Sequence, residues 1–245
     1  MPPRERRAAG QVAVNDNALA NNDNALANQV LRQFEPLDTF LVKQELEILE
    51  AVTGIETENS YQVLGAKGCK AMLGPVVAKE SSGFLARMVC GNKRPWTIRL
   101  GASPHILVIQ RPFKFFLQEV QVFTGDQDFL GTVKRECRGF PLISNFTIRD
   151  QDGEPVLRLT CPFWSWGWTF VLRDMEDNEI GKVSKKWAGL VQELFTDADN
   201  FGIGFPEDLP TRIKALVLAA VFLIDFCFFE DNEVQNGKRG GRARR

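Results

Sequence analysis

The chain has 245 residues, of which 44% are hydrophobic, and its formal net charge at pH 7 is −1. This composition can fill the core of one large domain or two small ones, and the near-zero charge argues against nucleic-acid binding driven by overall charge. Five scattered cysteines without a CxxC pair and a single histidine argue against a disulfide framework, a zinc site or a histidine-activated nucleophile. A Gly-rich phosphate loop is also absent, so the sequence predicts a protein that is not an enzyme.

Residues 1–38 are expected to form a disordered arm. They contain the near-repeat DNALAN, at 16–21 and again at 23–28, which offers one leucine per copy. Such a segment buries too little apolar surface to offset the entropy that it would lose on ordering. A short amphipathic helix is the alternative.

Residues 39–230 are expected to form the folded domain, built mainly of β-strands. The stretch FLVKQELEILEAV at 40–52 fits both a helix and a strand, but the pattern after residue 54 favours strands. In RPWTIRL, for example, Trp96, Ile98 and Leu100 alternate with Thr97 and Arg99. Further strands are expected in HILVIQ (105–110), LQEVQVF (117–123) and the two halves of NFTIRDQDGEPVLRL (145–159), where DQDG is a hairpin turn. Such regularly spaced strands are typical of a barrel or a sandwich.

The strongest strand pattern is PFWSWGWTFVL at 162–172, which places Trp164, Trp166 and Trp168 on one face. If this face lies in the core, three indole N–H groups need buried partners. The alternative is an aromatic rim at a bilayer surface, where one edge of each ring meets water.

The most hydrophobic segment is the expected helix at 213–229. Its fifteen apolar-rich residues from 215 to 229 would span roughly 22 Å as a helix, whereas a bilayer core is about 30 Å thick. Asp225 would also be costly in the middle of a bilayer. A buried core helix, apolar on all sides, is the preferred interpretation, and a transmembrane anchor is the alternative.

The segment 231–245 is expected to be a basic, disordered tail. Its last nine residues carry five cations and no acid: Lys238, Arg239, Arg242, Arg244 and Arg245. Such a cluster attracts phosphate on a membrane, on RNA or at an import receptor, unless it is simply a solvated tail.

Several longer stretches resemble the phospholipid scramblase family. They are LVKQELEILEAVTGIETENSYQV, RPWTIRL, QRPFKFFLQEVQV, FTIRDQDGEPVLRL and, most specifically, GKVSKKWAGLVQELFTDADNFGIGFPEDLPTRIKALVLAAVFLIDFCFFE. The resemblance covers about residues 40–230 and implies a tubby-like fold, a closed twelve-stranded barrel around a hydrophobic C-terminal helix. It also favours a strand for the ambiguous segment at 40–52.

The resemblance implies Ca²⁺-dependent, energy-independent movement of phospholipids between leaflets, at the cytoplasmic face of the plasma membrane. The alternative is a tether that binds anionic lipid without moving it, with a cytoplasmic or nuclear location and a nucleic-acid role for the basic tail. A polar path across a bilayer would require a homo-oligomer or a thinned bilayer, because one short helix offers none.

Better-known members of the family carry lipidated cysteine clusters that this chain lacks. The matching stretch is RPFKFFLQEV, so aromatic side chains are expected to replace the fatty chains. The expected lipid-contact residues are Trp164, Trp166, Trp168, Phe113, Phe115, Phe116, Lys114 and Arg111.

The resemblance also implies a weak calcium site in twelve residues from Asp197 to Asp208. Asp197, Asp199 and Asp208 would supply carboxylates, and the carbonyls of Phe201, Ile203 and Phe205 would complete the oxygen shell. Because two of these positions are phenylalanines and the last is the shorter Asp, binding should be weak. The alternative is a structural turn followed by a strand in FGIGF.

Overall fold

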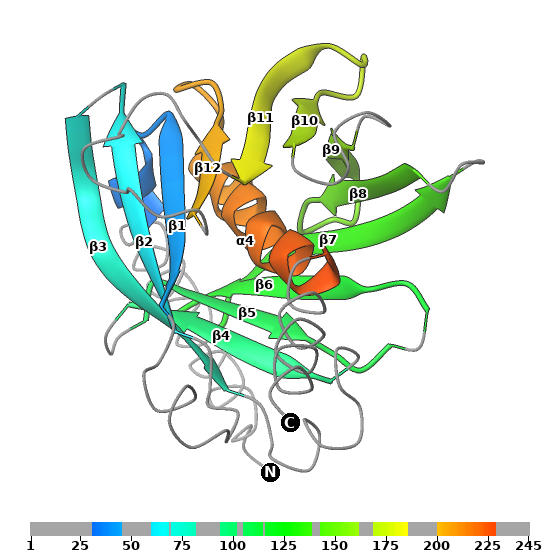
Figure 1. Ribbon diagram of the computed structural model, residues 1–245, viewed down its shortest axis with the longest axis horizontal. Helices are drawn as coiled ribbons and strands as arrows, with labels where there is room; N and C mark the ends of the chain where they lie inside the picture. The colour runs from blue at the N-terminus through cyan, green and yellow to red at the C-terminus, as the bar shows by residue number, and fades with distance from the viewer. Residues whose placement is uncertain are drawn as a thin grey trace, which may run out of the picture.

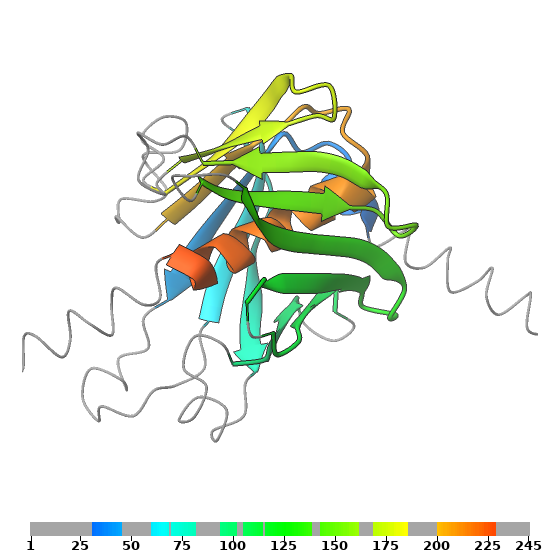
Figure 2. The same cartoon turned by 90° about the vertical axis from the view of Figure 1, so that its right-hand side faces the viewer.

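The computed structural model describes residues 31–45, 60–68, 70–81, 94–101, 105–114, 116–138, 143–161, 169–185 and 200–228. Within these ranges, twelve strands close into one antiparallel barrel and an α-helix runs through it (Figure 1, Figure 2). The expected fold class, a closed barrel that encloses a hydrophobic C-terminal helix, is confirmed.

Each strand pairs with its neighbours in sequence, and β1 completes the ring by pairing with both β2 and β12. A closed ring leaves no unpaired sheet edge, which is how barrels avoid edge-to-edge association. The strands are β1 (Thr39–Glu45), β2 (Ser60–Lys67), β3 (Lys70–Ser81), β4 (Trp96–Leu100), β5 (Leu107–Arg111), β6 (Glu119–Thr124), β7 (Phe129–Arg138), β8 (Ile143–Arg149), β9 (Pro155–Thr160), β10 (Thr169–Arg173), β11 (Glu179–Lys185) and β12 (Asn200–Gly204).

The alternation read from the sequence correctly predicts which side chains face the barrel interior. In β4, Trp96, Ile98 and Leu100 are buried, whereas Thr97 and Arg99 are partly or fully exposed. The DQDG turn joins β8 to β9 as expected, with Gly153 at a φ of +85° that favours glycine. The segment at 40–52 contributes β1 up to residue 45, so the strand interpretation is confirmed for its described part.

The expected arm at 1–38 requires a correction where the structure describes it. Residues 32–34 form a short 3₁₀ helix, η1 (Arg32–Phe34), and Leu31, Phe34 and Leu37 are almost completely buried in the core. The ring of Phe34 packs edge-on against Phe40 of β1, with centroids 5.2 Å apart. These apolar side chains offset the entropy lost on ordering residues 31–38.

The C-terminal helix α4 (Thr211–Phe228) lies inside the barrel and packs against η1, β6, β7 and β8. Every residue from Lys214 to Phe226 is buried, which explains why the helix is apolar on all sides. Aromatic contacts fix it to the wall: Phe222 meets Tyr61 and Phe226 meets Trp96, each at 5.1 Å between ring centroids. The buried-helix interpretation is therefore confirmed. In the part of the chain that the structure describes, no helix combines the length and apolar character needed to cross a membrane.

Candidate membrane-contact site

The connection between β5 and β6, residues 112–118, carries the two most exposed large apolar side chains among the described residues, Phe116 and Phe113. Phe116 is 83% exposed, Phe113 is 52% exposed and Leu117 is 39% exposed. Phe115 lies outside the described residues. Exposed phenylalanines gathered in one loop indicate a surface that binds another apolar phase, because a soluble fold gains nothing from leaving them in water. We call residues 112–118 the aromatic loop.

The base of the aromatic loop is fixed by a buried hydrogen-bond network. Arg111 Nε and Nη2 both donate to Gln118 Oε1, at 3.0 and 2.5 Å, and Arg111 Nη1 donates to the carbonyl of Arg94 at 3.3 Å. Gln118 Nε2 in turn donates to the carbonyl of Lys114 at 3.1 Å. The two ends of the loop are therefore joined, and the phenylalanines are presented from a fixed base.

This network changes the role expected for the two basic residues. Arg111 was expected to contact lipid, but it is only 3% exposed and serves the loop from within the barrel. Lys114 forms an ion pair with Glu119 at 2.5 Å, which neutralises its charge at the surface. Neither residue is placed as a free cation for lipid phosphates, so the loop presents apolar rather than basic chemistry.

The loop base is also connected to the end of helix α4. The guanidinium groups of Arg94 and Arg111 both lie over the ring of Phe226, at 4.7 and 4.8 Å from its centroid. Arg94 pairs with the buried Glu80 at 3.2 Å. Buried cations need such partners because desolvation is costly. The aromatic loop and the C-terminal end of α4 thus share one packed cluster.

The described residues of the expected calcium site, 200–208, begin with a β-strand instead of a metal-binding loop. Residues 200–204 form β12, which pairs with β1 on one side and β11 on the other. The carbonyls of Phe201 and Ile203 therefore belong to sheet ladders instead of a metal-binding loop. Phe205 continues this pairing, because its amide donates to the carbonyl of Asp38 at 2.9 Å. The FGIGF strand of the alternative interpretation is what the structure contains.

The carboxylates of the calcium hypothesis are separated by this strand in the sequence. Asp208 lies in an exposed turn between β12 and α4, whereas Asp197 and Asp199 precede β12 and lie outside the described residues. Among the residues that the structure does describe, no cluster of three or more His, Cys, Asp or Glu side chains is arranged to hold a metal ion. Calcium binding by Asp197 and Asp199 stays a prediction.

Two further groups of predicted contacts also lie outside the described residues. They are Trp164, Trp166 and Trp168, and the basic tail that carries Lys238, Arg239, Arg242, Arg244 and Arg245. The strand that follows the tryptophans is described as β10, where Phe170 and Leu172 face the core. The lipid contact of the three indoles stays a prediction.

Two polar residues inside the barrel have roles that the sequence did not reveal. Lys214, on the first turn of α4, is fully buried, and Asp225, near the other end, is 5% exposed. The hydroxyl of Tyr61 donates to Asp225 Oδ2 at 3.2 Å. Asp225 makes a bilayer location costly, but no sequence pattern indicates its partner, which lies 164 residues away.

The chain is similar to known proteins of one family. The family model described as Scramblase matches residues 18–231. Phospholipid scramblase 1 of Homo sapiens is 33% identical over 224 residues, covering 86% of this chain and 69% of that protein. Phospholipid scramblase 2 of Bos taurus is 35% identical over 214 residues, covering 82% and 71%. Phospholipid scramblase family member 5 of Homo sapiens is 30% identical, covering 82% and 77%. No solved structure matches the chain.

Proposed function

Because the chain belongs to the phospholipid scramblase family, we propose that it acts at a membrane and moves phospholipids between the two leaflets without covalent chemistry. The movement needs no energy source, since lipids flow down their own gradient. The exposed phenylalanines of the aromatic loop carry this proposal, because they supply the apolar contact with a bilayer.

The loop supports membrane entry energetically. Burying one phenylalanine side chain contributes about 2 kcal/mol, so Phe113 and Phe116 together bring several kcal/mol to the bound state. The fixed base at Arg111 and Gln118 lowers the entropy lost on binding, because the two ends of the loop are already joined. Helix α4 is enclosed and offers no path for headgroups, so transfer would follow from local disturbance of the bilayer at the loop or in an oligomer.

Calcium enters the proposal as a weak regulatory ion. Asp197 and Asp199 would supply carboxylates, and the phosphates of anionic lipid would complete the oxygen shell that Ca²⁺ requires. In this arrangement the ion bridges protein and membrane, so binding to anionic vesicles would rise with Ca²⁺ and fall on chelation.

Replacement of Phe116 by Ser tests the proposal. The side chain is 83% exposed, so folding should be unaffected, while the partition coefficient onto vesicles should fall about tenfold or more. Phe129→Ser is the control, because Phe129 is a 38% exposed phenylalanine at the start of β7, outside the aromatic loop. Transfer of a labelled lipid is then followed in liposomes that hold only this protein, with Ca²⁺ and with chelator. Lipid transfer that stays at the protein-free rate at every protein density would refute scrambling.

A lipid tether that does not scramble is the second candidate, and the enclosed helix favours it. Within the part of the chain that the structure describes, α4 fills the barrel and leaves no polar lane across a bilayer, whereas surface binding needs only the loop. The protein is a tether if the wild type binds vesicles strongly, the Phe116→Ser variant does not bind them, and the wild type never accelerates lipid transfer. Membrane association is common to both candidates.

A further inference from the structure

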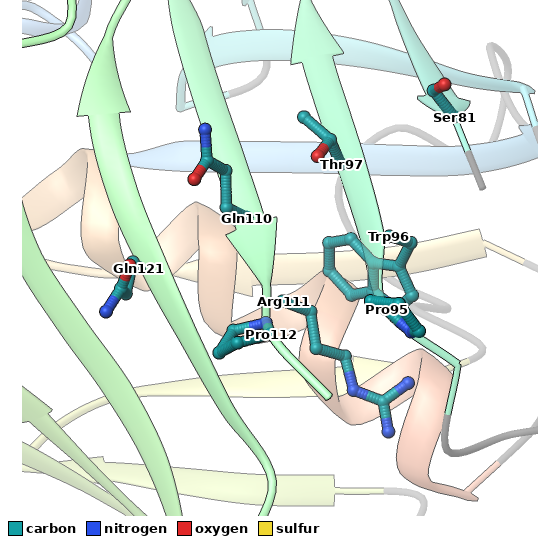
Figure 3. Close-up of a pocket in the computed structure, with 8 residues that line it drawn as sticks. All are labelled: Ser81, Pro95, Trp96, Thr97, Gln110, Arg111, Pro112 and Gln121. Atoms are coloured by element: carbon teal, nitrogen blue, oxygen red, sulfur yellow. The ribbon is translucent and has the colours of Figure 1, made fainter. Parts of the chain in front are cut away.

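A pocket of about 230 Å³, lined by polar side chains and by Pro95, Trp96 and Pro112, lies across β3, β4, β5 and β6. Four uncharged side chains stand side by side there, because Ser81 pairs with Thr97, Thr97 with Gln110, and Gln110 with Gln121 (Figure 3). Drug-sized ligands occupy pockets of roughly 300–1,000 Å³, so this one has room for a smaller polar group. Hydroxyls and amides both donate and accept hydrogen bonds, which suits a phosphodiester with polar substituents.

Two exposed cations stand directly beside this row. Lys79 of β3 and Arg99 of β4 are cross-strand partners, two residues away from Ser81 and Thr97. Side chains in such pairs have Cβ atoms about 5 Å apart, and like charges at this distance destabilise a sheet. No described residue forms a hydrogen bond or an ion pair with either side chain. The pair is therefore complementary to an external anion, which would relieve the repulsion.

The aromatic loop lies at the other side of the pocket. Pro112 lines the pocket and Phe113 follows it directly, while the guanidinium of Arg111 extends away from Thr97 and Gln110 (Figure 3). On β3 and β4 the outer surface thus changes from neutral polar at Ser81 and Thr97 to cationic at Lys79 and Arg99, whereas the same row continues on β5 and β6 with Val108 and Phe123. Each step of two residues is about 6.6 Å along a strand, close to the roughly 5–8 Å depth of one headgroup layer.

We propose that this sector binds one phospholipid of the membrane, with its headgroup in the pocket. Thr97, Gln110 and Gln121 would hydrogen-bond the phosphodiester and its substituent, Lys79 and Arg99 would attract the phosphate charge, and Phe113 would contact the acyl chains. The site rests on the membrane action proposed above, and it adds the residues that select a headgroup. We call it the headgroup site.

Two double variants separate the headgroup site from general membrane attraction. Lys79→Gln with Arg99→Gln removes the cations, and binding to vesicles of phosphatidylcholine mixed with phosphatidylserine should weaken about tenfold or more at low salt. Thr97→Val with Gln110→Met removes the polar lining, and binding should weaken about tenfold on pure phosphatidylcholine as well, with its salt dependence unchanged. Lys134→Gln with Arg158→Gln is the control for the loss of two cations, and Thr160→Val is the control for the loss of a threonine hydroxyl, because these residues lie at outward positions of β7 and β9.

The outcomes distinguish this site from the proposed function. Binding of wild-type protein that is lost in both double variants and kept in the controls supports the headgroup site. Wild-type binding that no variant weakens overturns the site but leaves the proposed membrane action intact. Wild-type protein that never binds either vesicle overturns both. Inorganic phosphate and unlabelled phosphatidylserine-containing vesicles are also tested as competitors for the vesicle-bound protein. If phosphate displaces the protein as readily as the vesicles do, the site binds free anions and the lipid inference is overturned. A cooperative thermal unfolding transition verifies that every variant is folded.

Discussion

Lys214 is a cation enclosed in a hydrophobic barrel, and its partners are almost all backbone carbonyls. Its ammonium donates to the carbonyls of Phe34, Glu35, Leu37 and Glu207, at distances of 2.7–3.2 Å. It thereby fastens the η1 segment and the turn before α4 to the helix. Nothing in the sequence marks this lysine, because a basic residue in a first helical turn usually faces solvent and opposes the helix dipole.

We expect Lys214→Met to lower the free energy of unfolding by about 3 kcal/mol, because four carbonyls lose a charged donor. Chemical denaturation followed by circular dichroism measures this loss. Lys67→Met is the control, since Lys67 also meets Glu207, but in an exposed ion pair with side chains 47% and 52% accessible. Such a pair contributes about 1 kcal/mol or less. Equal losses in the two variants would contradict the buried anchor.

The same lysine predicts how stability depends on pH. Burial lowers the pKa of Lys214 below its usual 10.5, despite the opposing charges of Glu207 and Asp38. Between the folded and the unfolded pKa, the unfolded chain binds more protons, so the contribution of Lys214 to stability rises with pH in that window. The stability difference between wild type and Lys214→Met should therefore widen from neutral pH towards pH 10.5. A difference that narrows over this range would show the opposite shift.

At the scale of the elements, sequence periodicity predicts strands and the helix well because it reports burial directly. Trp96, Ile98 and Leu100 alternate because one face of β4 is in the core, and α4 is apolar all round because the barrel encloses it. Sequence periodicity does not predict the side-chain contacts of the candidate membrane-contact site. The phenylalanines of the aromatic loop are visible in the sequence, but the burial of Arg111 depends on Gln118 and Phe226, and the row from Ser81 to Gln121 depends on strand register.

The contact between α4 and β2 carries a second prediction at this scale. Tyr61→Phe keeps the ring contact with Phe222 but removes the hydroxyl that donates to Asp225. We expect the free energy of unfolding to fall by about 1–2 kcal/mol, because a buried carboxylate loses a donor. Tyr61→Phe with Asp225→Leu should cost less than the sum of the single changes, which a double-mutant cycle measures. Strict additivity would mean that the hydroxyl and the carboxylate do not interact.

At the scale of the whole molecule, the enclosed helix predicts which side of a membrane the C-terminal residues occupy. If α4 left the barrel to cross a bilayer, the inward faces of β4, β5 and β7 would be exposed to water, including Ile98, Ile109 and Val133, which are now fully buried. Each such side chain costs about 1.5–3 kcal/mol to expose, so a barrel of this size keeps its helix. Protease added outside sealed vesicles that carry the protein on their outer surface should therefore remove an epitope fused after residue 245. An epitope that survives until detergent opens the vesicles would mean that α4 has crossed the bilayer. The barrel would then have lost its central helix.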